Sequence, residues 1–121
     1  MSSYNDLDIY KMAYKFAIEV HDLSLTLPKY ELYEQGSQVR RSSKSIKDTI
    51  AEGYGRKRYK ADFIKFLTYA QASCNETISQ LTMINEIHFL ENELNEIIKN
   101  YNLLGSKINK FIQYFDSNWK T

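Results

Sequence analysis

The sequence is poor in cysteine, proline and glycine, and has no long apolar run. Its 121 residues include one cysteine, one proline and four glycines. A single cysteine, Cys74, excludes an internal disulfide and most cysteine-rich metal sites. No run approaches the roughly 18 apolar residues of a membrane-spanning helix. The N-terminus also lacks the basic region and apolar run of a signal peptide. These absences predict a soluble cytoplasmic protein.

Signals for strands and for common catalytic sites are also missing. There are no alternating β-branched runs and no Asn-Gly or Asp-Gly pairs, which would mark hairpins. Phosphate-loop, dinucleotide-binding and nucleophile-elbow motifs are absent. The two histidines, His21 and His88, are too far apart in the sequence to form a local metal motif. We therefore predict no enzymatic activity, no cofactor and no metal. The length favours one domain over residues 1–121.

Apolar residues recur three and four positions apart in four long segments, which is the spacing of a helical face. The expected helices cover about Asp6–Leu27, Glu31–Glu52, Lys60–Phe89 and Asn92–Phe115. Pro28 stops the first helix because it lacks an N–H and disfavours the helical region for the preceding residue. Gly53 and Gly55 are expected to end the second in the left-handed conformation. Four long helices with short connections favour an all-α, up-down-up-down antiparallel four-helix bundle.

Two of these helices carry more apolar or uncharged surface than one core face requires. The first has two apolar stripes, where a simple surface helix needs only one. They are Leu7, Tyr10, Tyr14, His21 and Leu25, and Ile9, Met12, Phe16, Val20, Leu23 and Leu27. The third has a nearly uncharged back strip formed by Ile64, Thr68, Ala72, Asn75, Ser79 and Met83. A single four-helix chain of this size cannot bury both sides, so we expect a homo-oligomer.

Charge is distributed unevenly, although the formal net charge is only +1. Eight of the sixteen basic residues lie between Arg40 and Lys60, against two acids. The segment from Glu76 to Ile98 holds five acids and no lysine or arginine. The chain therefore has a basic stretch and an acidic stretch.

The basic stretch is the candidate site for a nucleic acid, because phosphates attract lysine and arginine. The candidate residues are Arg40, Arg41, Lys44, Lys47, Arg56, Lys57 and Arg58. Lys44 and Lys47 lie opposite the apolar face of the second helix, and both are expected to be exposed, as is Lys57. Tyr54 and Tyr59 lie among them and could stack on bases. The alternative is a solvated face with local ion pairs to Asp48, Glu52 and Asp62, and tyrosines that only pack at a helix end.

Two carboxylates invite a catalytic interpretation, and the single thiol does not. Paired carboxylates can divide acid and base roles, but Glu52 and Glu76 have no accompanying nucleophile or histidine motif. Ion pairs with Arg40, Arg41 or Arg56 are the favoured interpretation. Cys74 lies on the expected core face, where a cysteine acts as a small hydrophobic residue.

The centre of the chain carries a specific set of motifs, which are Leu27-Pro28, Glu31, Tyr33, Gln38-Val39-Arg40-Arg41, Ser45-Ile46, Ile50-Ala51-Glu52-Gly53, Gly55-Arg56, Phe63, Phe66-Leu67, Ala70, Ser73 and Glu76. In these residues the chain resembles the bacterial 23S rRNA-intervening-sequence protein family. The resemblance extends over roughly residues 7 to 115. Two positions depart from the family pattern: Thr49 replaces a usual asparagine, and Ala72 replaces a frequent glycine.

The resemblance implies a four-helix bundle that assembles into a homopentameric ring. It also implies a relationship to the accessory variability determinant of diversity-generating retroelements, a basic pentamer that binds a reverse transcriptase and nucleic acid. We therefore expect a non-enzymatic oligomer that binds RNA or DNA, or acts as a ribonucleoprotein accessory factor. The alternative is a homo-oligomeric scaffold that recognises a protein partner and binds no nucleic acid.

Overall fold

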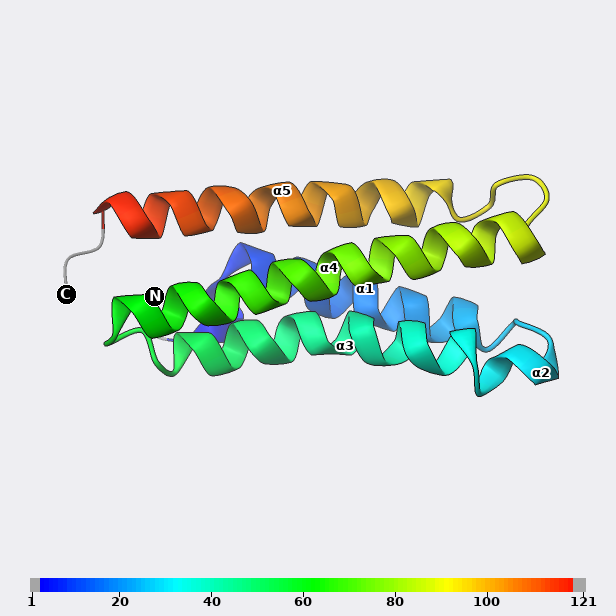
Figure 1. The fold of residues 1–121 in the computed structure, drawn as a ribbon, viewed down its shortest axis with the longest axis horizontal. Helices are drawn as coiled ribbons and strands as arrows, with labels where there is room; N and C mark the ends of the chain where they lie inside the picture. Colours follow the sequence, from blue (N-terminus) through cyan, green and yellow to red (C-terminus); the bar gives the residue numbers. More distant parts are fainter. Residues whose placement is uncertain (1–2, 119–121) are drawn as a thin grey trace.

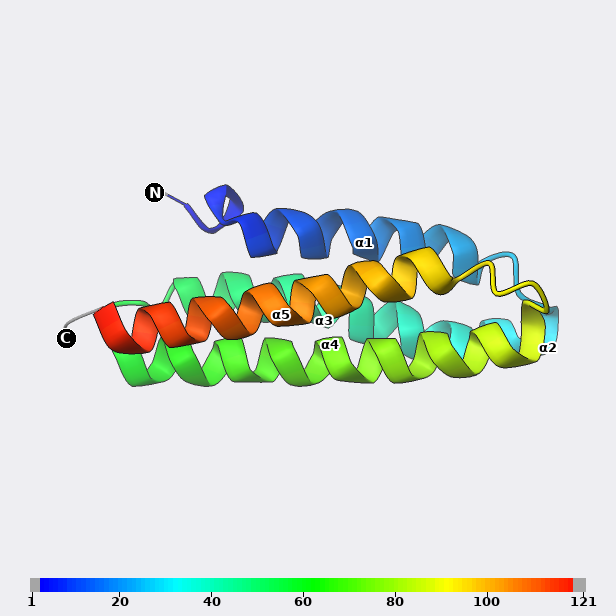
Figure 2. The ribbon, with the colours of Figure 1, turned by 90° about the horizontal axis from the view of Figure 1, so that it is seen from above.

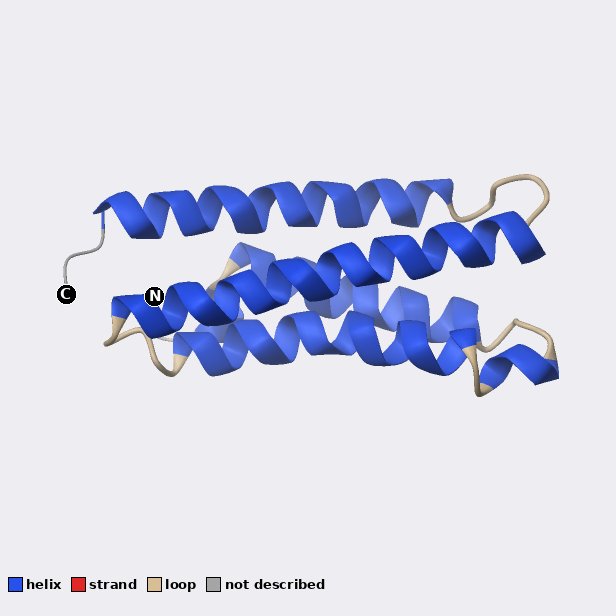
Figure 3. Ribbon diagram, in the orientation of Figure 1, coloured by secondary structure: helices blue, strands red, loops and turns tan. Residues whose placement is uncertain are grey.

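A computed structural model describes residues 3–118 of the protein, and every regular element in that range is a helix (Figure 3). The elements are a 3-10 turn η1 (Tyr4–Asp6), α1 (Asp8–Ser24), α2 (Lys29–Leu32), α3 (Gln35–Tyr54), α4 (Lys60–His88) and α5 (Asn95–Asn118). The predicted all-α class with four long helices is confirmed. The predicted breaks near Pro28, Gly53–Arg58 and Leu90–Asn92 all fall in connections or at helix ends.

The four long helices lie lengthwise beside one another (Figures 1 and 2). α3 packs on α4 and α4 on α5, while α1 contacts both α3 and α5. Each long helix therefore has two long neighbours and turns one face inward. The connection between α3 and α4 lies at one end of the molecule, and the α1–α3 and α4–α5 connections lie at the other (Figure 1).

All four long helices contribute fully buried apolar side chains to one core. The largest are Tyr101, Phe63, Leu7, Ile46, Ile50, Leu67, Leu81, Ile84, Leu104 and Ile108. Of the two stripes on α1, the one with Ile9, Phe16 and Val20 is buried. In the other stripe, Tyr14 is 47% and Leu25 is 55% exposed. Leu7 of the same stripe is buried, and Tyr10 and His21 are half-buried, so this stripe is only partly uncovered in the single chain.

The second predicted helix is divided into α2 and α3. Glu34 has φ −109° and ψ −102°, which is not helical, so α3 begins at Gln35 rather than Glu31. The buried Glu31 side chain accepts a hydrogen bond from Gln35 and lies 2.7 Å from His88 Nε2. A contact with the far end of α4 thus accompanies the break. The fourth helix also begins later than predicted, after Asn92 at φ 58°.

The second predicted helix does end at Gly55, but the predicted left-handed conformation of Gly53 and Gly55 was wrong. No glycine of residues 3–118 has a positive φ, and Gly55 follows α3 at φ −63°. Gly53 is instead buried within α3 at the crossing with α4. A Cβ atom added there would lie 2.7 Å from the Phe66 Cβ, so the absence of a side chain permits the close approach.

Candidate nucleic-acid interface

The basic and acidic stretches lie at different places along the bundle. The basic stretch covers α3 and the connection to α4, while much of the acidic stretch lies beyond the other end of α4 (Figure 1). A helix of 29 residues is roughly 43 Å long at 1.5 Å per residue. The α3–α4 connection and the acidic α4–α5 connection are therefore separated by about the length of the molecule.

Arg40 is a structural residue rather than a member of an open basic face. Its side chain is half-buried, and its guanidinium donates hydrogen bonds to Ser24 Oγ at 2.9 Å and to the Leu32 carbonyl oxygen at 2.7 Å. These bonds connect α3 to the end of α1 and to α2. The partners differ from the predicted Glu52 and Glu76.

Lys44 and Lys47 lie in the groove between α3 and α1, where both are half-buried. Lys44 Nζ is 3.0 Å from His21 Nδ1. Lys47 Nζ donates to Asp48 Oδ1 at 2.5 Å and lies 5.8 Å from the centroid of the Tyr14 ring. The hydrogen bond with Asp48 raises the pKa of Lys47. The prediction that both lysines are freely exposed was wrong, because neighbouring side chains of α1 and α3 contact them.

Arg41 is exposed on the opposite side of α3, facing α4. It lines a polar depression of about 430 Å³ with Gln38, Ser42, Ser45, Glu76 and Gln80. Ser42 Oγ donates to Gln80 Oε1 at 2.6 Å across the two helices. Arg41 is therefore separated from Lys44 and Lys47, which lie on the α1 side.

The α3–α4 connection interleaves basic and aromatic side chains. Arg56 pairs with Glu52 at 3.6 Å and with Asp62 at 3.9 Å, and its guanidinium carbon lies 4.9 Å from the Phe66 ring centroid. The Glu52–Arg56 pair is one of the ion pairs that the sequence favoured. Arg56 is exposed, but its two acids reduce its net attraction for phosphate.

Lys57 and Arg58 differ in how they meet the adjacent tyrosines. Lys57 is half-buried, donates to the Tyr54 hydroxyl at 2.7 Å and lies 3.9 Å from the centroid of that ring. The predicted exposure of Lys57 was therefore wrong. Arg58 is exposed, with its guanidinium carbon 5.8 Å from the Tyr59 ring centroid. Tyr59 itself is 61% exposed.

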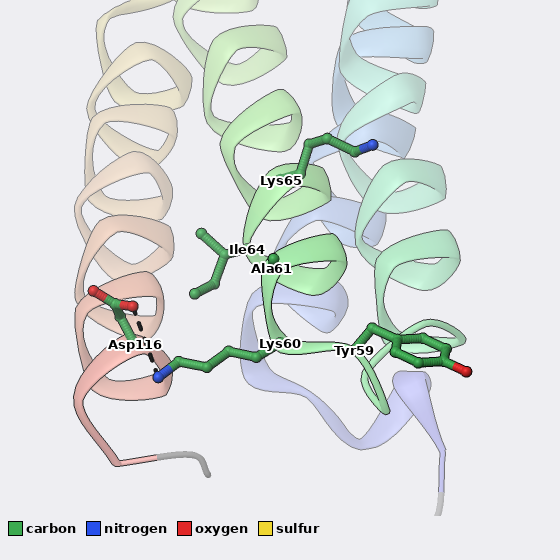
Figure 4. Close-up of a pocket in the computed structure, with 6 residues that line it drawn as sticks. All are labelled: Tyr59, Lys60, Ala61, Ile64, Lys65 and Asp116. Carbon is green, nitrogen blue, oxygen red and sulfur yellow. Dashed lines mark ion pairs between the residues drawn. The ribbon is translucent and has the colours of Figure 1, made fainter. Parts of the chain in front are cut away.

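The first two turns of α4 add a residue that the predicted site lacked. Lys65 is exposed and lines a depression of about 700 Å³ with Tyr59, Lys60, Ala61, Ile64 and Asp116 (Figure 4). Lys65 lies outside the Arg40–Lys60 window, so the charge count along the sequence did not include it. Within residues 3–118, neither Lys65 nor Arg58 forms an ion pair with a carboxylate.

The remaining titratable groups of the core do not resemble a reactive site. Cys74 is fully buried as predicted, and its thiol donates to the Tyr101 carbonyl oxygen at 3.2 Å. Burial raises the pKa of Cys74 to about 11, which disfavours the nucleophilic thiolate. Residues 3–118 contain no cluster of three histidine, cysteine or acidic side chains suited to holding a metal. No helix in this range is both long and apolar enough to cross a membrane.

Comparison with known proteins identifies relatives of the chain. No curated protein matches the sequence. A crystal structure of a protein of unknown function from Bacteroides thetaiotaomicron, described as a member of the S23 ribosomal protein family, is similar to it with 26% identity and a TM-score of 0.61. That similarity covers 86% of this chain and 94% of the other. The family model for the 23S rRNA-intervening sequence protein matches residues 5–110. Because this match spans most of the 121 residues, the chain belongs to the 23S rRNA-intervening sequence protein family.

Proposed function

We propose that the protein is a non-enzymatic homo-oligomer that binds nucleic acid through the basic end of its bundle. Each subunit is an up-down-up-down antiparallel bundle, and the assembly is the homopentameric ring that the family resemblance implies. The binding surface is narrower than the basic stretch of the sequence. It comprises Arg56, Arg58, Tyr59, Lys60 and Lys65, and leaves out Arg41, which lies further along α3 beside Glu76 and Gln80.

The observation that carries this proposal is the pair of exposed cations without acidic partners at one end of the bundle. Arg58 and Lys65 are exposed and have no carboxylate partner within residues 3–118. Arg58 flanks the ring of Tyr59, and Lys65 Nζ lies 5.7 Å from the Phe66 ring centroid. Basic side chains interleaved with aromatic rings form the kind of surface on which single strands are bound.

Two uncovered faces support assembly of the chain into a ring. On α4, Thr68, Ala72, Asn75, Ser79 and Met83 are exposed and carry no charge. On α1, Tyr14, Ile18 and Leu25 are 47%, 52% and 55% exposed, respectively. Two different faces that each need a partner suit head-to-tail contacts, which close into rings when the rotation permits. A ring would repeat the basic end once per subunit, so weak contacts would add through multivalency.

The rival function is a homo-oligomeric scaffold for a protein partner. It is favoured by the partnered state of Arg40, Lys44, Lys47 and Lys57, which leaves fewer free cations than the sequence contains. Salt dependence separates the two functions. Each phosphate neutralised by a cation makes binding fall more steeply as salt rises.

The test compares two double variants with the same change in charge. Arg58→Glu with Lys65→Glu alters the basic end, whereas Lys29→Glu with Lys99→Glu alters exposed lysines elsewhere on the bundle. Labelled RNA and DNA are titrated with each oligomer at low and at raised salt. We expect the parent and the Lys29/Lys99 variant to bind with a steep salt dependence. The Arg58/Lys65 variant should bind at least about tenfold more weakly and with a shallower slope.

All proteins must first show the same helix content and the same sedimentation, so that loss of binding is not loss of assembly. Exposed substitutions usually change stability by about 0.5 kcal/mol or less, so both variants should fold. Equal binding by the two double variants would contradict the proposed surface. A parent oligomer that binds neither RNA nor DNA at low salt would leave the scaffold as the function.

A further inference from the structure

We propose that Tyr59 and the depression beside it form a stacking subsite for an unpaired base of a single-stranded nucleic acid. This inference rests on the proposed function and adds the class of ligand and the residue that contacts its base. The subsite consists of the exposed Tyr59 ring, the Arg58 side chain that flanks it, and Lys65, which points to the same side of α4.

The shape of the depression follows from how the first residues of α4 point. Ala61 is exposed, and Figure 4 shows Lys60 and Ile64 pointing towards α5. Tyr59 and Lys65 point the other way, towards α3 (Figure 4). The depression is shallow and open to solvent, so the Tyr59 ring at its rim remains accessible. The Tyr59 ring therefore lies on the α3 side of the start of α4, where its exposed face suits the flat surface of a base.

Only one of the two tyrosines in the basic stretch has its ring available. Tyr54 is half-buried, lies 6.1 Å from the Phe63 ring centroid, and is covered by Lys57. Tyr59 is 61% exposed even though the Arg58 guanidinium lies over its ring. A guanidinium beside the ring adds a cation that can contact the same nucleotide. Tyr59 is therefore the stacking residue, and Tyr54 is a packing residue.

The charges around the depression assign the backbone contacts. Lys60 Nζ lies 3.9 Å from Asp116 Oδ1, so this lysine is partly neutralised (Figure 4). Arg56 is likewise shared between Glu52 and Asp62. Arg58, which flanks the Tyr59 ring, and Lys65, which lines the same depression, form no such pair within residues 3–118. Phosphates on either side of a stacked nucleotide would meet these two side chains.

The arrangement favours a single strand over a duplex. A tyrosine can stack only on a base whose face is accessible, and duplex bases hide their faces against neighbouring pairs. Stacking on an aromatic ring is also tolerant of sequence, because every base has such a face. We therefore expect RNA and DNA single strands to bind with little sequence preference, and duplexes to bind only through their phosphates.

The experiment measures binding of labelled oligothymidylate, oligouridylate and a blunt DNA duplex to three variants of the full chain. Tyr59→Ala removes the ring, Tyr59→Phe keeps it, and Tyr33→Ala removes a ring that is 82% exposed elsewhere on the bundle. We expect Tyr59→Ala to weaken binding of both single strands about fivefold or more, the effect of losing one stacked base. Tyr59→Phe and Tyr33→Ala should bind as the parent does, and no variant should change duplex binding.

The outcomes separate this subsite from the wider proposal. Unchanged single-strand binding by Tyr59→Ala overturns the subsite, and so does an equal loss for the duplex. If Arg58→Glu with Lys65→Glu still weakens binding in that case, the proposed function stands without the subsite. A parent that binds no nucleic acid removes both. Selective weakening of one single strand by Tyr59→Ala supports the subsite and shows whether its ligand is RNA or DNA.

Discussion

Gly53 and Phe66 meet where α3 crosses α4. A Cβ atom on Gly53 would lie 2.7 Å from the Phe66 Cβ and 3.2 Å from Phe63 Cδ1. Both neighbours belong to α4, and Phe63 is itself fully buried between Tyr54, Phe111 and Phe115. A methyl group at position 53 would therefore force the two helices apart. The same contact holds the basic α3–α4 connection next to Phe66, on which Arg56 and Lys65 rest.

Gly53→Ala should lower the free energy of unfolding by about 1–3 kcal/mol, the usual cost of overpacking a core. Gly105→Ala is the matched control, because its added Cβ would lie 3.5 Å from Cys74 Sγ, an ordinary contact. Alanine favours a helix over glycine by about 1 kcal/mol, so the control should be neutral or more stable. Urea denaturation followed by circular dichroism measures both. Equal stability of the two variants would rule out a tight crossing at Gly53.

A second prediction concerns the buried carboxylate that ties α2 to the end of α4. Glu31 and His88 are both almost fully buried, and Oε2 of the first lies 2.7 Å from Nε2 of the second. Glu31→Ala should lower the free energy of unfolding by about 1.5–3 kcal/mol, as expected for a hydrogen bond to a charged group. Glu34→Ala, an exposed glutamate three positions later, should change it by about 0.5 kcal/mol or less. Matching denaturation midpoints for the two variants would refute a role for the pair.

The Glu31–His88 contact is an example of a feature that depends on two segments far apart in the sequence, and such features were not predicted. The three-and-four spacing identified every long helix, since that spacing is a property of each segment alone. The break before Gln35 was missed because the sequence of this segment does not show its tertiary contacts. Glu31, just before the break, contacts His88, which lies 57 positions further along the chain. Gly53 was assigned to a helix cap for the same reason, as its neighbour Phe66 belongs to another helix.

In the candidate site, too, the contacts between helices were not predicted. Arg56 and Arg58 lie at an exposed connection, and their exposure followed from the glycines and charges around them. Lys44 and Lys47 were expected to be free because they lie opposite the apolar face of α3. One helix alone cannot reveal that α1 brings His21 and Tyr14 against those lysines.

A third prediction follows from the buried thiol. Burial raises the pKa of Cys74 from 9.0 to about 11, so the folded chain keeps this proton over a range in which the unfolded chain loses it. The free energy of unfolding should therefore fall between about pH 9 and pH 11, by up to about 1.4 kcal/mol per pH unit from this group. Burial also raises the pKa of Tyr101, which adds a decrease of the same sign.

Cys74→Ala isolates the contribution of the thiol. The variant should lose stability through its smaller side chain, but its free energy of unfolding should decline less steeply than that of the parent over this pH range. The two slopes, rather than the two absolute values, are compared by denaturation at several pH values. Parallel slopes would show that Cys74 ionises alike in the folded and unfolded chains.

The last prediction concerns the uncharged strip of α4 as an interface between subunits. Ser79 is exposed in the single chain, yet it lies between Asn75 and Met83 on a face without charge. Ser79→Arg would bury an unpaired cation if that face is covered by another copy, and such a charge is strongly destabilising. The variant should therefore sediment as a folded monomer or small species where the parent forms the larger oligomer. Ser106→Arg makes the same substitution at an exposed serine of α5 and should leave the assembly intact.

Sedimentation velocity at micromolar concentration distinguishes these results, with circular dichroism to show that both variants remain helical. If Ser79→Arg assembles as fully as Ser106→Arg, the strip is a solvated face and the ring must use another surface. A parent that is itself monomeric would refute the oligomer.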